Sequence, residues 1–291
     1  MGNWLNEETV RAMLPPRPEE GHKGTFGRVV IAGGQYGMAG APLLATRAAL
    51  RCGVGLAETA IPRCLYPLLA AAVPEAIFTP LPDTDGGQLA LCAADSLTAR
   101  LNGASALVFG CGLGQGGELT ALVRTVLAAA PCPTVLDADG INAVNRHILS
   151  TEKRRAPLVL TPHPGEMARL WETSPAAVQA ERERFAAETA WECGAVTVLK
   201  GHHTVIAAPD GRLWKNPTGN AGMATGGSGD ALAGMIGSLL AQGLSPETAA
   251  CAGVYLHGLA GDRAAARLSQ TALLPSDLID ELCRLFADWK R

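Results

Sequence analysis

Short apolar segments, each ended by glycine or polar residues, recur along the first two thirds of this 291-residue chain. The first, residues 28–32, reads Arg-Val-Val-Ile-Ala and is followed by two glycines. Similar segments occupy residues 56–61, 104–109, 133–137, 158–161 and 195–199. Stretches with helical spacing of apolar residues occupy residues 39–52, 118–130, 140–144 and 175–193. Strands that alternate with helices in this way predict a mostly parallel sheet covered by helices on both faces.

The sequence changes character after Lys200. Residues 204–208 and 212–214 flank the turn Pro209-Asp-Gly211, and this predicts an antiparallel hairpin appended to the sheet. Helices are predicted over the rest, at residues 230–242, 245–268 and 275–289. The sequence contains no linker, repeat or low-complexity tract, so we expect one α/β domain over residues 1–291, built as a three-layer α/β/α sandwich.

Composition favours a small-molecule ligand. Hydrophobic residues make up 48% and charged residues 18%, with a formal net charge of −3, and no long run of Lys and Arg suggests nucleic acid or a membrane surface. The eight cysteines are scattered singly, which argues against a disulfide framework or a metal ribbon. The N-terminus is polar and lacks an apolar signal core, so we expect a cytoplasmic protein.

One run of residues, 216–230, stands out because it holds five glycines between Gly219 and Gly229 and ends on Asp230. An apolar helical segment follows at once. Glycine lets backbone N–H groups turn toward an anion, and a helix N-terminus adds its positive end. We therefore predict a phosphate nest at Gly226, Gly227, Ser228 and Gly229. Asp230 would accept a proton from a hydroxyl that attacks phosphorus, as the catalytic Asp of kinases does; the alternative is a glycine-rich turn with Asp230 as a helix cap.

The other polar and glycine-rich motifs all follow predicted strands. They are Gly33-Gly34, Gly110 to Gly114, Asp137 to Asp139, His163 to Glu166 and Lys200-Gly201. The carboxyl ends of parallel strands form the ligand crevice of open sheets, so these loops and the glycine run predict one large site.

Seven motifs occur in a fixed order: Lys23-Gly-x-x-Gly27, Gly37-Met-Ala-Gly-Ala41, Gly110-x-Gly-Leu-Gly114, Leu136-Asp-Ala-Asp-Gly-Ile-Asn142, Thr161-Pro-His-Pro-Gly-Glu166, Lys200-Gly-x-x-Thr204 and the run 216–230. With them the chain resembles the ADP-dependent NAD(P)H-hydrate dehydratases, a branch of the ribokinase-like superfamily, from about Lys23 onward. The resemblance implies a ribokinase-like fold, a homotetramer and Mg²⁺ with ADP. Many members carry an N-terminal epimerase domain; we expect none here, so a separate NAD(P)H-hydrate epimerase would act in the same pathway.

The resemblance also implies roles for individual residues. The hydrated dinucleotide would lie against Ala41, Gly114, His163 and Asp230. The nucleotide would contact Lys200, Gly201, His202, His203, Thr204 and Gly229. The segment His163-Pro-Gly-Glu166 is similar to the Asn-x-x-Glu motif with which ribokinase-like sugar kinases order water around magnesium. Glu166 is therefore a candidate for indirect Mg²⁺ binding.

Several of these residues have structural alternatives. His163 is flanked by two prolines, which favours a ligand contact at the rim over a buried structural histidine. Glu166 is nearly as well explained as a carboxylate in the first turn of a helix. His202 and His203 lack a third metal ligand at suitable spacing, so a metal site there is rejected. Asp137 and Asp139 could form a carboxylate pair, but a helix cap and a strand end are the favoured interpretation.

The function implied by the resemblance is repair of damaged cofactor. The enzyme, a hydro-lyase, would convert the S form of NAD(P)H hydrate back to NAD(P)H, with ADP cleaved to AMP and phosphate. The alternative is a vitamin or sugar kinase of the same superfamily. That enzyme would share the glycine nest and Asp230 but would release a stable phosphorylated product.

Overall fold

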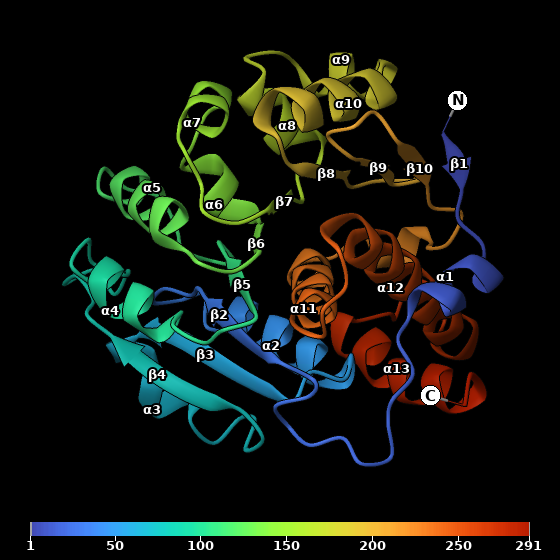
Figure 1. The fold of residues 1–291 in the computed structure, drawn as a ribbon, viewed down its shortest axis with the longest axis horizontal. Coiled ribbons are helices and arrows are strands. Elements are labelled where there is room, and N and C mark those ends of the chain that lie inside the picture. The colour runs from blue at the N-terminus through green and yellow to red at the C-terminus, as the bar shows by residue number, and fades with distance from the viewer. Residues whose placement is uncertain (1, 291) are drawn as a thin grey trace.

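A computed structural model describes residues 2–290, which form a sheet of ten strands between layers of helices (Figure 1). In sheet order the strands are β1 (Asn3–Trp4), β10 (Leu213–Lys215), β9 (Val205–Ala207), β8 (Val196–Leu199), β7 (Leu158–Leu160), β6 (Thr134–Leu136), β5 (Ala106–Phe109), β2 (Arg28–Ala32), β3 (Leu56–Pro62) and β4 (Ile77–Leu81). Strand β9 pairs antiparallel with both neighbours, and every other pairing in the sheet is parallel. The mostly parallel sheet with an appended hairpin is confirmed.

The helices follow the expected order with several additions. They are α1 (Glu7–Met13), α2 (Gly40–Arg51), α3 (Tyr66–Leu69), α4 (Ala93–Arg100), α5 (Leu119–Ala129), α6 (Ala138–Asn142), α7 (Arg146–Thr151), α8 (Pro164–Leu170), α9 (Pro175–Ala180), α10 (Arg182–Cys193), α11 (Ser228–Ala241), α12 (Pro246–Leu268) and α13 (Pro275–Asp288). The single helix predicted over residues 175–193 was wrong. The chain leaves helical geometry at Glu181, whose φ and ψ are −134° and 44°, and α9 and α10 form instead.

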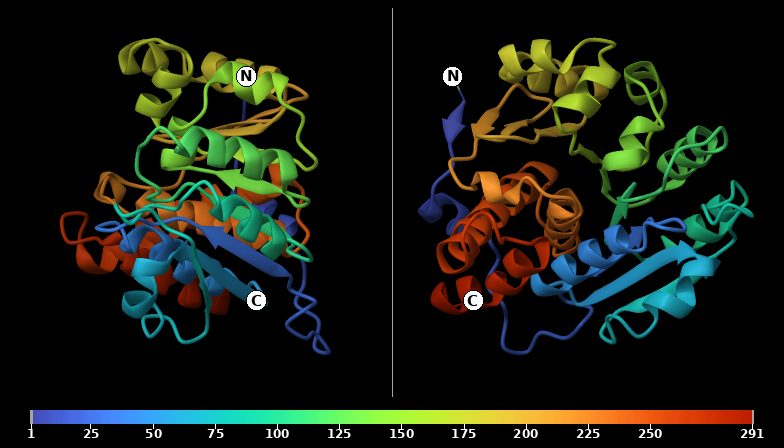
Figure 2. Two further views of the ribbon diagram at one scale, coloured as in Figure 1. Left: turned by 90° about the vertical axis from the view of Figure 1, so that its left-hand side faces the viewer. Right: turned by 180° about the vertical axis from the view of Figure 1, so that it is seen from behind.

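Alternating side chains of the central strands divide the apolar core into two layers. On β2, Val29 and Ile31 pack in one cluster with α2, α11, α12 and α13. Val30 and Ala32 point to the other face and pack with α4 and α5. This period of two is what a strand buried on both faces requires. Figure 2 shows the helices on the two faces of the sheet from the side and from behind.

The sheet reverses its winding between β2 and β5. These strands are neighbours in the sheet although α2, β3, β4 and α4 separate them in the chain. The loops after the two strands meet there, because the N–H of Gly34 donates to the carbonyl of Cys111 at 2.8 Å. Ligands of open α/β sheets bind at such a switch point, outside the carboxyl ends of the strands. Helix α11 packs directly against α2 and β5, so its N-terminus reaches this rim.

No helix within residues 2–290 combines the length and the apolar character that crossing a lipid bilayer demands.

Candidate active site

A cavity of about 800 Å³ opens where the strands β6, β7 and β8 end and α11 begins. Many of the predicted site residues line it: His163, Glu166, Lys200, Gly201, His202, His203, Thr204, Gly226, Gly227, Ser228, Gly229 and Asp230. Three of the five predicted strand-end loops, those at Asp137, His163 and Lys200, thus line one cavity with the glycine run, whereas Gly33-Gly34 and Gly110 to Gly114 lie outside its lining. A volume of this order accommodates a small-molecule ligand.

The glycine run turns into α11 through a left-handed residue. Gly227 is the N-cap of α11, with φ of +95°, and a Cβ atom built there would lie 2.4 Å from Leu44 Cδ1. Glycine is required at this position because side chains rarely adopt that φ and the space is filled. The N-cap residue is Gly227 and Asp230 lies within the first turn, so the interpretation of Asp230 as the helix cap was wrong.

His257, on α12, forms a hydrogen bond with the first turn of α11. Its Nε2 lies 2.9 Å from the carbonyl oxygen of Ser228, so the ring donates a hydrogen bond to that carbonyl. Burial lowers the pKa of His257 to about 4, and the ring is therefore neutral at physiological pH. Sequence reasoning missed this residue, because it lies in a helical segment of small apolar residues with no local motif.

Asp230 lies among polar groups that strongly influence its ionisation. Its carboxylate, the thiol of Cys111 and the carboxylate of Asp137 place their ligand atoms within 4.8 Å of one another. Burial raises the pKa of Asp230 to about 6, and repulsion from Asp137 adds to the rise. The side chain is thus ionised at neutral pH and accepts a proton more readily than an exposed aspartate does.

Lys200, at the end of β8, forms an ion pair with Asp137. The Lys200 Nζ lies 2.9 Å from Asp137 Oδ1 and 3.8 Å from Glu166 Oε2. Burial alone would lower the pKa of Lys200, but the carboxylates of Asp137 and Glu166 outweigh it and raise the pKa. A Cβ built on Gly229 would lie 3.2 Å from the same Nζ, so the ammonium group stands beside the glycine nest. A phosphate group at the nest could pair with this ammonium group.

The favoured interpretation of Asp137 and Asp139, a helix cap and a strand end, is confirmed only for the N-cap position of Asp137, because Asp139 lies inside α6. Asp137 is the N-cap residue of α6, but its side chain makes no cap hydrogen bond and binds Lys200 and the Thr161 hydroxyl instead. Asp139 Oδ2 accepts a hydrogen bond from the backbone N–H of Gly114 at 2.8 Å. Both carboxylates therefore organise the site, and the lysine that holds Asp137 is 63 residues away in the chain.

His163 and Glu166 form a capping box at the start of α8. His163 Nδ1 accepts from the N–H of Gly165 at 2.9 Å, and Glu166 Oε2 accepts from the N–H of His163 at 2.7 Å. Glu166 is therefore a first-turn carboxylate of α8, as one of the two interpretations predicted. Its buried carboxylate also faces Lys200. Burial lowers the pKa of His163, and Lys200 and Arg169 lower it further, so a neutral ring lies half exposed at the cavity.

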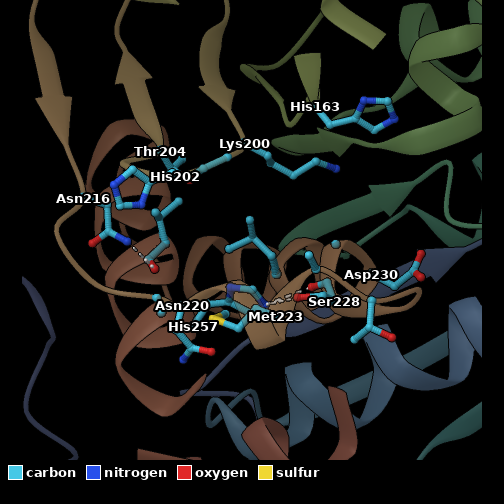
Figure 3. Close-up of a pocket in the computed structure, with 18 of the residues that line it drawn as sticks. His163, Lys200, His202, Thr204, Asn216, Asn220, Met223, Ser228, Asp230 and His257 are labelled. Carbon is cyan, nitrogen blue, oxygen red and sulfur yellow. Dashed lines mark hydrogen bonds between the residues drawn. The ribbon is translucent and has the colours of Figure 1, made fainter. Parts of the chain in front are cut away.

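The other end of the cavity is built from the turn after β8. Figure 3 shows His202, Thr204 and Asn216 on one side of the cavity and the tip of Lys200, His163 and Asp230 on the other. The ring centroids of His202 and His203 lie 3.7 Å apart. The Trp4 ring packs edge-on to that of His203, with 5.0 Å between the two centroids. Trp4 comes from the short strand β1, which the sequence pattern did not reveal.

Two predicted substrate contacts, Ala41 and Gly114, lie outside the lining of this cavity. Ala41 packs against the loop that contains Gly114, because a Cβ on Gly112 would lie 3.0 Å from the Cβ of Ala41. The side chain of Gln35 fills the space beside Gly114, where a Cβ would lie 2.1 Å from Gln35 Oε1. Both residues border the Cys111 side of the rim, and their contact with substrate stays a prediction.

Comparisons with known proteins agree with this geometry. A family model described as NAD(P)H-hydrate dehydratase matches residues 29–284. A bifunctional NAD(P)H-hydrate repair enzyme from Moorella thermoacetica is 47% identical over 278 residues, which cover 96% of this chain and 52% of that protein. The chain thus spans about half the length of this relative.

Two matches to proteins from Bacillus subtilis cover nearly the whole length of this chain and of the matched protein. An ADP-dependent (S)-NAD(P)H-hydrate dehydratase from that organism is 39% identical over 285 residues, covering 98% of this chain and 97% of the relative. A crystal structure of the ADP/ATP-dependent NAD(P)H-hydrate dehydratase, co-crystallized with ATP/Mg²⁺, superposes with a TM-score of 0.85 at 36% identity. That superposition covers 99% of each chain.

Proposed function

The chain belongs to the NAD(P)H-hydrate dehydratase family, and we propose that it converts the S form of NAD(P)H hydrate to NAD(P)H at the expense of ADP. The observation that carries this proposal is the position of Asp230. Its carboxylate stands in the first turn of α11, beside the glycine nest, at the end of the cavity that holds the Lys200 ammonium group. A proton acceptor next to a phosphate site serves a hydroxyl that attacks phosphorus.

The chemical difficulty of the reaction is that hydroxide is a poor leaving group. The hydroxyl oxygen of the hydrate attacks the terminal phosphorus of ADP, its proton passes to Asp230, and AMP leaves as the phosphorus–oxygen bond to it breaks. Electrons from the ring nitrogen then expel phosphate, and loss of a proton from the neighbouring carbon restores the ring double bond. The products are AMP, phosphate and the reduced cofactor.

The nest and Lys200 stabilise charge on the transferring phosphoryl group. Residues 226–229 at the N-terminus of α11 line the cavity, and Lys200 adds a cation beside Gly229. Removal of one such fixed donor typically costs about 3–4 kcal/mol of transition-state stabilisation. The turn from Gly201 to Thr204, at the other end of the cavity, would hold the rest of the nucleotide.

Mg²⁺ would enter with the nucleotide, and the carboxylates here fit a water-mediated role. Both oxygens of Glu166 already face protein groups, Oε2 the N–H of His163 and Oε1 the His163 ring. Glu166 would therefore hold a water of the ion rather than the ion itself, as Mg²⁺ usually keeps several waters. When bound, Mg²⁺ neutralises phosphate charge.

The proposal is tested by mixing the purified protein with the S hydrate, ADP and Mg²⁺. We expect the near-ultraviolet absorbance of the reduced nicotinamide to recover, with stoichiometric AMP and phosphate. A parallel assay with ATP in place of ADP measures the nucleotide preference. Accumulation of a stable phosphorylated product without NAD(P)H would instead identify a vitamin or sugar kinase.

We also propose the wider setting of the enzyme: a cytoplasmic homotetramer of single-domain chains over residues 1–291, in a pathway with an NAD(P)H-hydrate epimerase. The membership of all ten described strands in one sheet supports the single domain. Light scattering coupled to gel filtration tests the tetramer, and limited proteolysis tests the domain.

A further inference from the structure

The rim of the cavity contains a thiol between two carboxylates. Cys111 follows β5, Asp137 follows β6 and Asp230 lies in the first turn of α11, and their ligand atoms are all within 4.8 Å of one another. Cys111 is fully buried, Asp137 is 1% exposed, and Asp137 and Asp230 line the cavity. A cation that enters the cavity can therefore reach the two carboxylates and then the thiol behind them.

The neighbours of Asp137 leave one of its oxygens available to a cation. Oδ1 accepts hydrogen bonds from Lys200 Nζ at 2.9 Å and from the Thr161 hydroxyl at 2.6 Å. Oδ2 accepts a hydrogen bond from the Cys111 thiol at 3.9 Å, and this bond ends when the thiol loses its proton to a bound cation. Partners on the far oxygen fix the orientation of a carboxylate ligand, as the outer shell of metal sites does.

We propose that Cys111, Asp137 and Asp230 bind a thiophilic divalent cation such as Zn²⁺, which inhibits the enzyme by occupying the carboxylate of Asp230. One sulfur and two carboxylate oxygens give three protein ligands, and the cavity supplies a fourth position for water, as in open zinc sites. Coordination would release the thiol proton to solvent. Mg²⁺ prefers oxygen ligands, whereas thiol ligands favour softer cations such as Zn²⁺. A site that contains Cys111 is therefore distinct from the site of the magnesium that accompanies the nucleotide.

Binding and inhibition are tested separately, because only the inhibition rests on the proposed role of Asp230. The full chain is freed of metal by dialysis against a chelator and titrated with Co²⁺. We expect a thiolate-to-cobalt charge-transfer band that Cys111→Ser and Cys111→Ala both lose. Cys64→Ser is the matched control, because its thiol is exposed and is not part of the cluster, and it should keep the band.

Zn²⁺ inhibition is then measured at saturating Mg²⁺, with each variant compared with its own uninhibited rate. Loss of the thiol ligand should weaken inhibition by at least about 100-fold, the upper end of what removal of an outer-shell partner costs. A cobalt band that persists in both Cys111 variants would overturn the site. Zn²⁺ inhibition that survives in them but disappears in His202→Ala would place the inhibitory cation at the histidine pair. A cobalt band without Zn²⁺ inhibition would overturn the inhibitory role alone.

Discussion

Neighbouring side chains shift the pKa of Asp230 in opposite directions. Burial and the Asp137 carboxylate raise its pKa, whereas Cys111 and Lys200 lower it, and the resulting pKa is about 6. A value just below neutrality keeps most of the carboxylate ionised and still makes it a better proton acceptor than an exposed aspartate. Lys200 also binds Asp137, so this one ammonium group lowers the pKa of the proposed base and lies where the proposed phosphate would bind.

Replacement of Asp230 by asparagine removes the proton acceptor and keeps the shape. We expect kcat to fall by about 10²–10⁴-fold, the usual contribution of a general base, with nucleotide binding largely intact. Because the folded state raises the pKa of Asp230, its charge destabilises the fold above neutral pH. Above neutral pH, the melting temperature of Asp230→Asn should therefore equal or exceed that of the wild-type protein. Asp210→Asn, at an exposed turn, is the control and should keep wild-type turnover. A wild-type kcat in Asp230→Asn would refute the assignment of Asp230 as the general base.

The same pKa predicts the acid limb of the rate profile. The base must be ionised, so kcat/KM should decrease as pH falls through about 6, by tenfold per pH unit below it. Initial rates in buffers of constant ionic strength measure this limb. An acid limb centred near the pKa of an exposed aspartate would show that burial does not control the base.

Lys200 and Asp137 should be strongly coupled. Lys200→Met leaves the buried Asp137 carboxylate without its partner, which typically costs about 3–5 kcal/mol of folding free energy. The added substitution Asp137→Asn should recover much of that loss, whereas the affinity for ADP stays low because the phosphate has lost its cation. Denaturant unfolding and ADP titration of the two single variants and the double variant form the cycle, and purely additive stabilities would contradict the coupling.

At the scale of elements, the glycine nest depends on the backbone at the start of α11. In Gly227→Ala, the left-handed φ of +95° and the contact with Leu44 should cost about 1–2 kcal/mol of stability and lower kcat. Gly226→Ala is the matched control for stability, because a Cβ there would have no atom within 4 Å. Thermal melts and steady-state rates compare the two. Equal effects in both variants would show that nest geometry is not what Gly227 supplies.

Element prediction succeeded where local patterns were strong. The buried strands β2, β3, β5, β6, β7 and β8, the β9–β10 hairpin and the last three helices agree with the sequence to within about two residues. The edge strands β1 and β4 were not predicted. Strand β1 has only two residues, and β4 is partly exposed and contains Pro80. The break at Glu181 was missed because apolar spacing continues through it.

At the scale of the whole molecule, the site depends on contacts between distant segments. Motifs predicted many of the residues that line the cavity, since the carboxyl ends of parallel strands form the ligand crevice of open sheets, but Ala41 and Gly114 lie outside the lining and His257 was missed. The pairing of Lys200 with Asp137 and the support of Ser228 by His257 were not predicted, because each partner lies on a different element. The contact between Gln35 and Gly114 was likewise not predicted, because the two residues lie in different loops.

The most direct test follows the fate of one oxygen atom. The S hydrate is prepared with a heavy oxygen isotope in its ring hydroxyl and converted by the protein with ADP and Mg²⁺. If Asp230 helps that hydroxyl to attack phosphorus, the label should appear in the released inorganic phosphate. Label found in water instead would mean that hydroxide leaves directly, and the account of the site as a phosphoryl-transfer centre would be wrong.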